Sequence, residues 1–178
     1  MSINNDDELR SRSDSTASLK AQIVTNLRRY EPLVSALVEA EVDDTGEELD
    51  PSTVDVTGRI ATPMTAPGPE SIPPALLVIE IYSFSSQHRG SATTSNFSVE
   101  TGVTVTQGWI DQHNRANGSN PDLAMGRIFD AISERAHVSF GVSGLTPRDG
   151  GGGGEMSSPM RGGARARVRT WEFSRTRG

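Results

Sequence analysis

The chain has 178 residues, which is enough for one ordinary domain with its own hydrophobic core. It contains no cysteine, so disulfides, thiolate metal sites and cysteine nucleophiles are excluded. Its net charge of −6 argues against free nucleic acid as a partner, and no apolar run approaches the roughly 20 residues of a membrane span.

The chain begins with a segment that predicts a tail, followed by a helix. Residues 1–14 are rich in Ser, Asn and Asp and lack periodicity, so we expect a mobile tail before a domain over residues 15–178. One apolar stripe with steps of three and four then indicates an amphipathic helix; it comprises Leu19, Ile23, Leu27, Tyr30, Val34, Leu37 and Val38. Pro32 falls inside this helix. Because the stripe keeps its phase across the proline, we expect a kink rather than two helices.

Three less regular segments follow the helix. Residues 39–50 hold seven carboxylates, but residues 43–48 lack the EF-hand spacing, so a solvated acidic loop is expected there rather than a cation site. Residues 54–60 alternate briefly and predict a short edge strand. Residues 62–74 hold five of the ten prolines and predict an extended connector.

Two long strands form the centre of the predicted fold. Residues 75–84 are continuously apolar, as expected of a central strand buried on both faces. Residues 97–109 alternate, with Phe97, Val99, Val103, Val105 and Trp109 on one side. Residues 85–95 are polar and read as the turn between them, so we expect an antiparallel pair.

The rest of the chain predicts a polar linker at residues 111–120 and a second helix. Asn120, Pro121 and Asp122 form a strong helix start, and the apolar stripe of residues 123–136 continues it. Residues 137–142 alternate and predict a fourth strand. Residues 147–163, with five consecutive glycines, predict a flexible loop. Residues 165–173 predict a last strand with aromatic residues. This order indicates a single α+β domain, a mostly antiparallel sheet with two amphipathic helices packed on one face.

Chemical motifs of an enzyme are absent from the sequence. No two of His88, His113 and His137 have helical metal-ligand spacing, and no Gly-x-Ser-x-Gly elbow occurs. The glycine run has no following Lys-Ser or Lys-Thr, so it is not a phosphate loop. We therefore expect no enzymatic activity, no metal and no cofactor.

Charged residues are the candidates for interaction. Arg165, Arg167 and Arg169 alternate, so they share one side of the last strand. They form either a solvated face that blunts an edge strand, or a basic stripe that meets an acidic neighbour or a nucleic-acid backbone. For the strand alone, the solvated face is the expected interpretation. If copies of the chain assemble, this side either lines a lumen or meets the acidic stretch of the next copy, and of these two we prefer the contact between copies. The candidate residues on the acidic side are Glu41, Asp43, Asp44, Glu47 and Glu48.

The order of elements resembles the tail terminator, or tail completion, proteins of long-tailed bacterial and archaeal viruses. The likeness covers roughly residues 18–175 and rests on a long N-terminal helix with a proline-containing loop after it, and on four later elements. The first two are a strand introduced by prolines at residues 72–78 and an alternating strand that ends near an aromatic residue at residues 103–109. The other two are a helix rich in Ala and Ile at residues 123–136 and a basic and aromatic last strand at residues 165–173. The acidic loop and the glycine loop are longer than in that family, and the N-terminal tail is extra.

The resemblance implies a structural virion protein, in the tail or neck region, that is assembled in the host cytoplasm. It implies a hexameric ring at the head-proximal end of the tail tube, which ends tail polymerisation and joins tail to head. Its partners would be its own copies, the tail tube protein and a head-closure or neck protein, with DNA passing through the lumen without sequence-specific binding. The alternatives are a neighbouring neck, adaptor or tail-tube protein, or a non-viral small binding module.

Overall fold

A long antiparallel hairpin forms the centre of the computed structural model, which describes residues 5–116, 120–148, 156–159 and 164–177. Strand β2 (Ala75–Arg89) pairs with β3 (Ala92–Val105) from end to end, with one irregularity between Ser83 and Ser85. The expected antiparallel pair is therefore present. The expected polar turn at residues 85–95 is wrong, because both strands continue to a tight turn at Gly90, whose φ of 61° suits glycine.

Cross-strand hydrogen bonds explain why the polar segment is a strand. Asn96 Nδ2 donates to Ser85 Oγ over 2.6 Å, and the Thr94 hydroxyl bonds the Thr176 hydroxyl over 3.0 Å. Ser and Thr side chains thus satisfy one another across the sheet while the backbone ladder continues. Composition alone marked these residues as a loop, although Thr fits a strand well.

The other strands extend the sheet on both sides of the hairpin. The six strands of the described chain follow the order β1, β2, β3, β6, β4, with β5 also paired to β6. Strand β6 (Arg165–Arg177) runs antiparallel along β3, which confirms the expected last strand, and β1 (Ile60–Ala61) is parallel to β2. The short strands β4 (Thr146–Pro147) and β5 (Met156–Pro159) pair with β6.

Strand β5 corrects part of the expectation for residues 147–163. Its backbone is paired with β6, so this stretch is not a loop throughout. The run of five glycines that motivated the expectation lies at residues 150–154, outside the described residues. The expectation of flexibility came from the composition of the whole stretch. Strand β5 forms because its backbone pairs with the edge of β6, a contact that composition does not reveal.

The N-terminal helical region consists of two helices rather than one kinked helix. Helix α1 (Asn5–Arg28) ends before Tyr30, and α2 (Glu31–Val38) starts with Pro32 in its first turn, where a missing backbone N–H costs nothing. The apolar stripe keeps its phase because both helices bury it in the same core. Residues 5–14, expected as a tail, form the first turns of α1, and residues 1–4 lie outside the described residues.

A short helix replaces the expected polar linker. Helix α3 (Gln107–Arg115) begins after Thr106, whose hydroxyl accepts a hydrogen bond from the Trp109 backbone N–H, so the strand ends at Val105 and Trp109 is helical. Helix α4 (Pro121–His137) follows, capped by the Asn120 side chain as expected.

Two predicted strands are short 3₁₀ turns instead. Within residues 54–60, where a strand was expected, Val56–Gly58 form a 3₁₀ turn, and the Asp55 side chain accepts the hydrogen bond that caps it. Strand β1 begins only at Ile60. The expected fourth strand is replaced by the end of α4 and a turn at Ser139–Gly141, where Phe140 has a φ of 52°. Alternation over so few residues reflects which side chains are buried, not an extended backbone.

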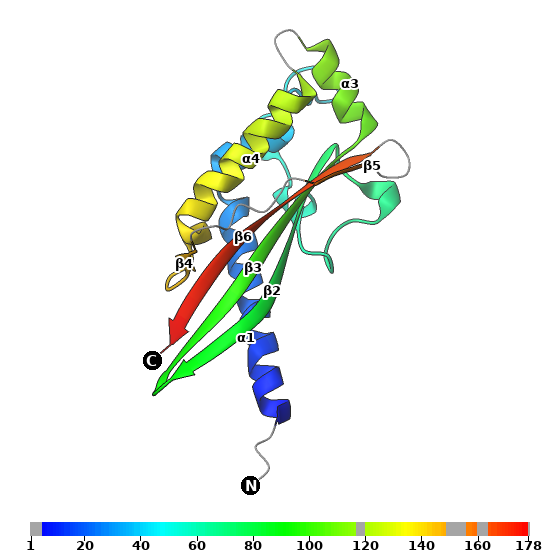
Figure 1. The fold of residues 1–178 in the computed structure, drawn as a ribbon. Coiled ribbons are helices and arrows are strands. Elements are labelled where there is room, and N and C mark those ends of the chain that lie inside the picture. Colours follow the sequence, from blue (N-terminus) through cyan, green and yellow to red (C-terminus); the bar gives the residue numbers. More distant parts are fainter. Residues whose placement is uncertain (1–4, 117–119, 149–155, 160–163, 178) are drawn as a thin grey trace.

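The four helices of the described chain all contribute to one core against one face of the sheet (Figure 1). Along β2, Leu77, Ile79 and Ile81 are buried in this core, while Tyr82 on the opposite face is 52% exposed. The expected α+β class is therefore correct, but β2 is not buried on both faces. Within the described residues, no helix combines the length and hydropathy that crossing a bilayer needs.

Replacing Val105 by Asp tests this packing. The side chain is 1% exposed, so a carboxylate there lacks a partner, and we expect a loss of more than about 4 kcal/mol or failure to fold. Thermal unfolding followed by circular dichroism measures it. Thr104→Asp, one residue away on the open face, should cost about 1 kcal/mol or less. Equal melting temperatures for Val105→Asp and the wild type would contradict the assigned core.

Candidate interaction surfaces

The arginine stripe (Arg165, Arg167 and Arg169) lies on the helix-covered face of β6. The strand pairs with β3 without interruption, so these residues share a face with Trp171 and Phe173, which are buried in the core. The predicted common side is therefore correct. Along the stripe, Arg165 is exposed, whereas Arg167 and Arg169 are half-buried.

The contacts that the stripe makes within its own chain are weak. Arg167 Nη2 lies 3.4 Å from Asp122 Oδ1, and the Asp122 side chain is 86% exposed, so this ion pair contributes little. The Arg169 guanidinium lies 5.4 Å from the centre of the Trp171 ring, in a cation–π contact. Arg165 is exposed, and no described residue bonds its guanidinium. The stripe can therefore meet another molecule without the loss of a strong contact.

The acidic turn (Asp43, Asp44, Glu47, Glu48 and Asp50) presents five exposed carboxylates. Its shape is set by its own backbone, since Val42 bridges Glu48 and the Asp43 carboxylate accepts hydrogen bonds from the backbone N–H groups of Thr45 and Glu47. The bond from the Thr45 hydroxyl, together with these N–H groups, lowers the pKa of Asp43. No ion pair to Lys or Arg links the turn to the rest of the described chain.

Glu41 is not part of this surface, which corrects its assignment as an interaction residue. It is 4% exposed and forms two hydrogen bonds of 2.7 Å with the Arg59 guanidinium. The chain reverses at Ala40, whose φ is 60°, and this reversal turns Glu41 inward. Its neighbour Glu39 is likewise paired, with Arg127 of α4. Nothing in the sequence near residue 41 marks Arg59 as its partner.

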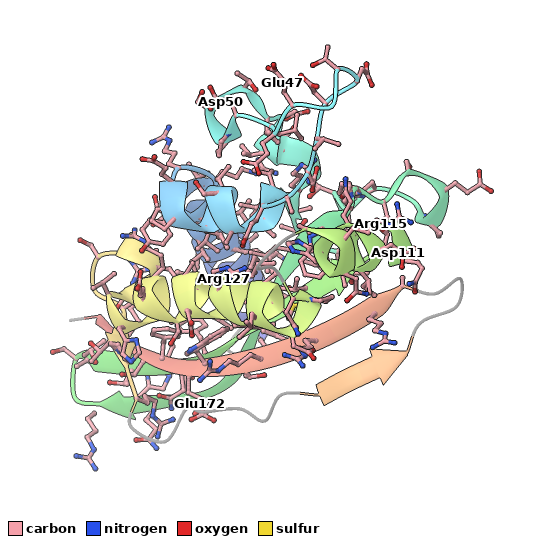
Figure 2. All side chains as sticks on the ribbon, turned by 90° about the horizontal axis from the view of Figure 1, so that it is seen from above. Glu47, Asp50, Asp111, Arg115, Arg127 and Glu172 are labelled. Carbon is pink, nitrogen blue, oxygen red and sulfur yellow. The ribbon has the colours of Figure 1, made fainter. Side chains whose placement is uncertain are left out.

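The two remaining charged surfaces lie on elements that α2 and α4 separate. Figure 2 shows Glu47 and Asp50 beyond α2 at one side, and β6 with Glu172 at the other, with α2 and α4 between them. One copy therefore cannot join its own arginine stripe to its own acidic turn.

His113 is a buried residue that sequence reasoning placed in a loop. It lies in α3, is 0% exposed, and its ring centre is 4.1 Å from that of Trp109. Burial lowers the pKa of His113, while Glu39 partly opposes that change. Trp109, Ile110 and His113 have the spacing of one face of a helix, and this was the sequence signal that could have predicted the burial of His113. No group of His, Asp or Glu in the described residues has the arrangement of a metal site.

The fold and these surfaces define a small α+β domain that carries an arginine stripe and an acidic turn. Comparison with protein-family models and with curated proteins finds no match for the chain.

The stability of the protein should depend on the protonation of His113. Because its folded pKa is lowered, the unfolded chain binds more protons below pH about 6.5, and stability is lost as pH falls through that value toward the folded pKa. His113→Gln should flatten this loss between pH 7 and 5, as measured by urea unfolding. The matched control is His137→Gln, at an exposed position. An identical pH dependence in wild type and His113→Gln would contradict this assignment.

The ion pair of Glu41 separates structural from surface carboxylates. Glu41→Gln leaves the nearly buried Arg59 guanidinium without its counter-charge, so we expect a loss of about 3 kcal/mol. Glu47→Gln in the exposed turn should change the free energy of unfolding by about 0.5 kcal/mol or less. Chemical denaturation of both variants measures the difference, and equal values would show that Glu41 is not a structural residue.

Proposed function

We propose that this protein is a structural virion protein that forms a ring, a hexamer by the resemblance above, at the head-proximal end of a viral tail tube. In this place it ends tail polymerisation and joins the tail to the head, by contacts and without catalysis or a cofactor. It would reside in the tail or neck region of the virion after assembly in the host cytoplasm.

The observation that carries the proposal is that α2 and α4 separate β6, the strand of the arginine stripe, from the acidic turn of the same domain. Contact between two unlike surfaces is head-to-tail, and such a contact produces a ring if the rotation between neighbours closes. The chain carries a net charge of −6, so copies repel one another unless an attractive contact of this kind joins them.

The arrangement of elements gives the proposal its second support. The elements on which the resemblance rests are present as α1, β2, β3, α4 and β6. A ring of such domains has two unlike faces, which suits a junction between the tail tube protein and a head-closure or neck protein. DNA would pass through the lumen without sequence-specific contacts, as the negative net charge favours.

A tail-tube or neck protein of the same particle is the second candidate, because head-to-tail contact also builds open tubes when the rotation does not close. The purified protein distinguishes the two. A tail-tube protein polymerises alone into long tubes, whereas a terminator stops at single rings. Electron microscopy of the concentrated protein shows which product forms.

Charge reversal of the stripe should prevent association. With Arg165, Arg167 and Arg169 all changed to Glu, the stripe and the acidic turn repel, and the protein should sediment as a monomer under conditions where the wild type forms rings. Analytical ultracentrifugation measures this, and association of the wild type should weaken as salt rises. If the variant assembled as the wild type does, the stripe would be a solvent-exposed face and not an interface between copies.

A matched variant controls for damage to the fold. When Asp43, Asp44, Glu47 and Glu48 are changed to Lys, the turn also repels the native stripe. Neither variant should then assemble alone, but a mixture should form rings in which the two alternate. Rescue by mixing excludes misfolding as the cause of either defect.

Loss of the gene tests the place of the protein in the virion. We expect filled heads without tails and free tails of uncontrolled length, because nothing occupies the growing end of the tube. Adding the purified protein to growing tubes should arrest them at roughly one ring per tube, as expected when closed symmetry leaves no further binding surface. Head-attached tails of normal length in the deletion would refute the function.

A further inference from the structure

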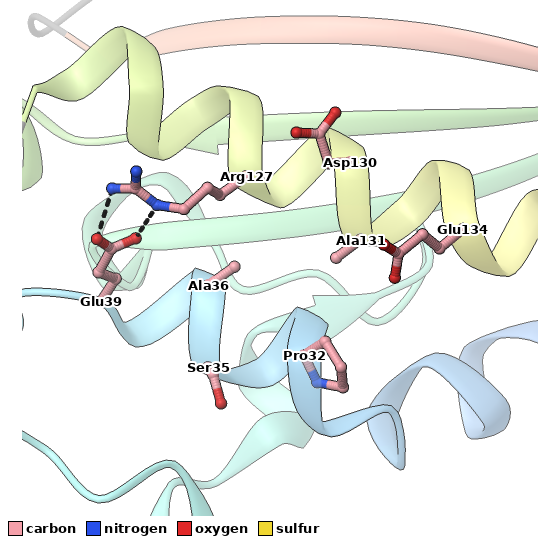
Figure 3. Close-up of a pocket in the computed structure, with 8 residues that line it drawn as sticks. All are labelled: Pro32, Ser35, Ala36, Glu39, Arg127, Asp130, Ala131 and Glu134. Carbon is pink, nitrogen blue, oxygen red and sulfur yellow. Dashed lines mark hydrogen bonds and ion pairs between the residues drawn. The ribbon is translucent and has the colours of Figure 1, made fainter.

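A groove of about 390 Å³ lies between α2 and α4. This volume is within the range of pockets that hold a ligand-sized group, roughly 300–1,000 Å³. Its floor is apolar, formed by Pro32, Ala36 and Ala131, and Ser35 lies on its α2 side. Figure 3 shows Glu39 and Arg127 at one end and Glu134 at the other.

The groove carries a net negative charge. Its charged residues are Glu39, Asp130, Glu134 and Arg127, and the carboxylate of Glu39 already holds the guanidinium of Arg127. Glu134 accepts a 2.6 Å hydrogen bond from the Tyr30 hydroxyl, which is neutral. Asp130 is exposed, and no described cation pairs with either Asp130 or Glu134. These two carboxylates are four residues apart on α4, so they repel until a cation neutralises them.

The chemistry of the groove suits an arginine side chain. Its aliphatic stem would lie on the apolar floor, and its planar guanidinium would bond the carboxylates of Asp130 and Glu134. A lysine would supply the charge as a single point, without the paired donors. The groove is close to the acidic turn in sequence, because Glu39 follows the last residue of α2 and the turn begins four residues later.

We propose that this groove receives the Arg165 side chain of a neighbouring copy, so that the end of the stripe anchors the head-to-tail contact. Arg165 is exposed, and no described residue bonds its guanidinium; it begins β6, a strand that lies beyond α4 from α2 and the acidic turn. Arg167 and Arg169 then face the acidic turn. The inference rests on the proposed self-association, but it assigns the anchor to α2 and α4 rather than to the turn.

Site-directed cross-linking tests the contact in the full chain, which has no cysteine of its own. Ser35→Cys in the groove and Ala164→Cys beside Arg165 leave every charged group in place. A short bismaleimide should join the two variants when they are mixed and should join neither variant to itself. Thr45→Cys, in the acidic turn, replaces Ser35→Cys as the matched control and should cross-link less.

Variants that neutralise the carboxylates measure how much the groove contributes to the free energy of association. Asp130→Asn with Glu134→Gln should weaken association about tenfold, the loss expected for one charge-assisted contact. Asp44→Asn with Glu47→Gln removes the same charge from the turn and should weaken association about threefold or less, as exposed rim charges do.

The outcomes separate the anchor from the ring. Cross-linking of Ala164→Cys to Thr45→Cys but not to Ser35→Cys, or a larger effect of the turn variant, would overturn the groove as the anchor and leave the head-to-tail contact intact. A protein that stays monomeric and forms no cross-link would overturn the groove and the proposed ring together.

Discussion

The pairing of β2 with β3 is the constraint on which the other elements depend. Its register places Leu77 opposite Val103 and Ala75 opposite Val105, so one face of the hairpin is a continuous apolar surface. Helices α1, α2 and α4 bury their stripes there, and β6 is added to the free side of β3. A shift of one residue would turn every core side chain to the open face, which is why the register is strongly specified.

The same register determines where the arginine stripe lies. Arg165 pairs with Val105 and Arg167 with Val103, and both valines are buried in the core face. Aliphatic arginine stems beside such residues extend the apolar surface, while their guanidinium groups reach water. Cations at the margin of the core can thus contribute to packing while their charge stays in water, and substitution by a short side chain would remove both the contact and the charge.

Internal ion pairs leave the exposed charge on one side unbalanced. Glu39 and Glu41 belong to the acidic stretch in the sequence, and Arg127 of α4 and Arg59 neutralise them. The first pair links the end of α2 to α4, and the second links the segment after α2 to the residue before β1. The five carboxylates of the acidic turn are exposed, and their turn is held by its own hydrogen bonds rather than by a cation. A surface that is already shaped and still charged pays little ordering entropy when it binds an oppositely charged one.

Periodicity in the sequence was sufficient for the α+β class, the hairpin strands, the stripe on β6 and helix α4, because each rests on many consecutive residues with one burial pattern. Pro32 was consistent either with one kinked helix or with two separate helices. Only the tertiary structure, in which α2 packs beside α4, shows that there are two. The sequence also could not predict α3, because a nine-residue helix with three buried residues is formed by docking rather than by propensity.

The candidate site divides in the same way. The strand period was enough to place Arg165, Arg167 and Arg169 on one side, and composition identified the acidic stretch. Tertiary structure alone decided that Glu41 is buried against Arg59, that His113 is enclosed beside Trp109, and that a groove separates α2 from α4. The physical reason is range: a local pattern reports which way a side chain points, whereas its partner is brought to it by contacts between segments distant in the chain.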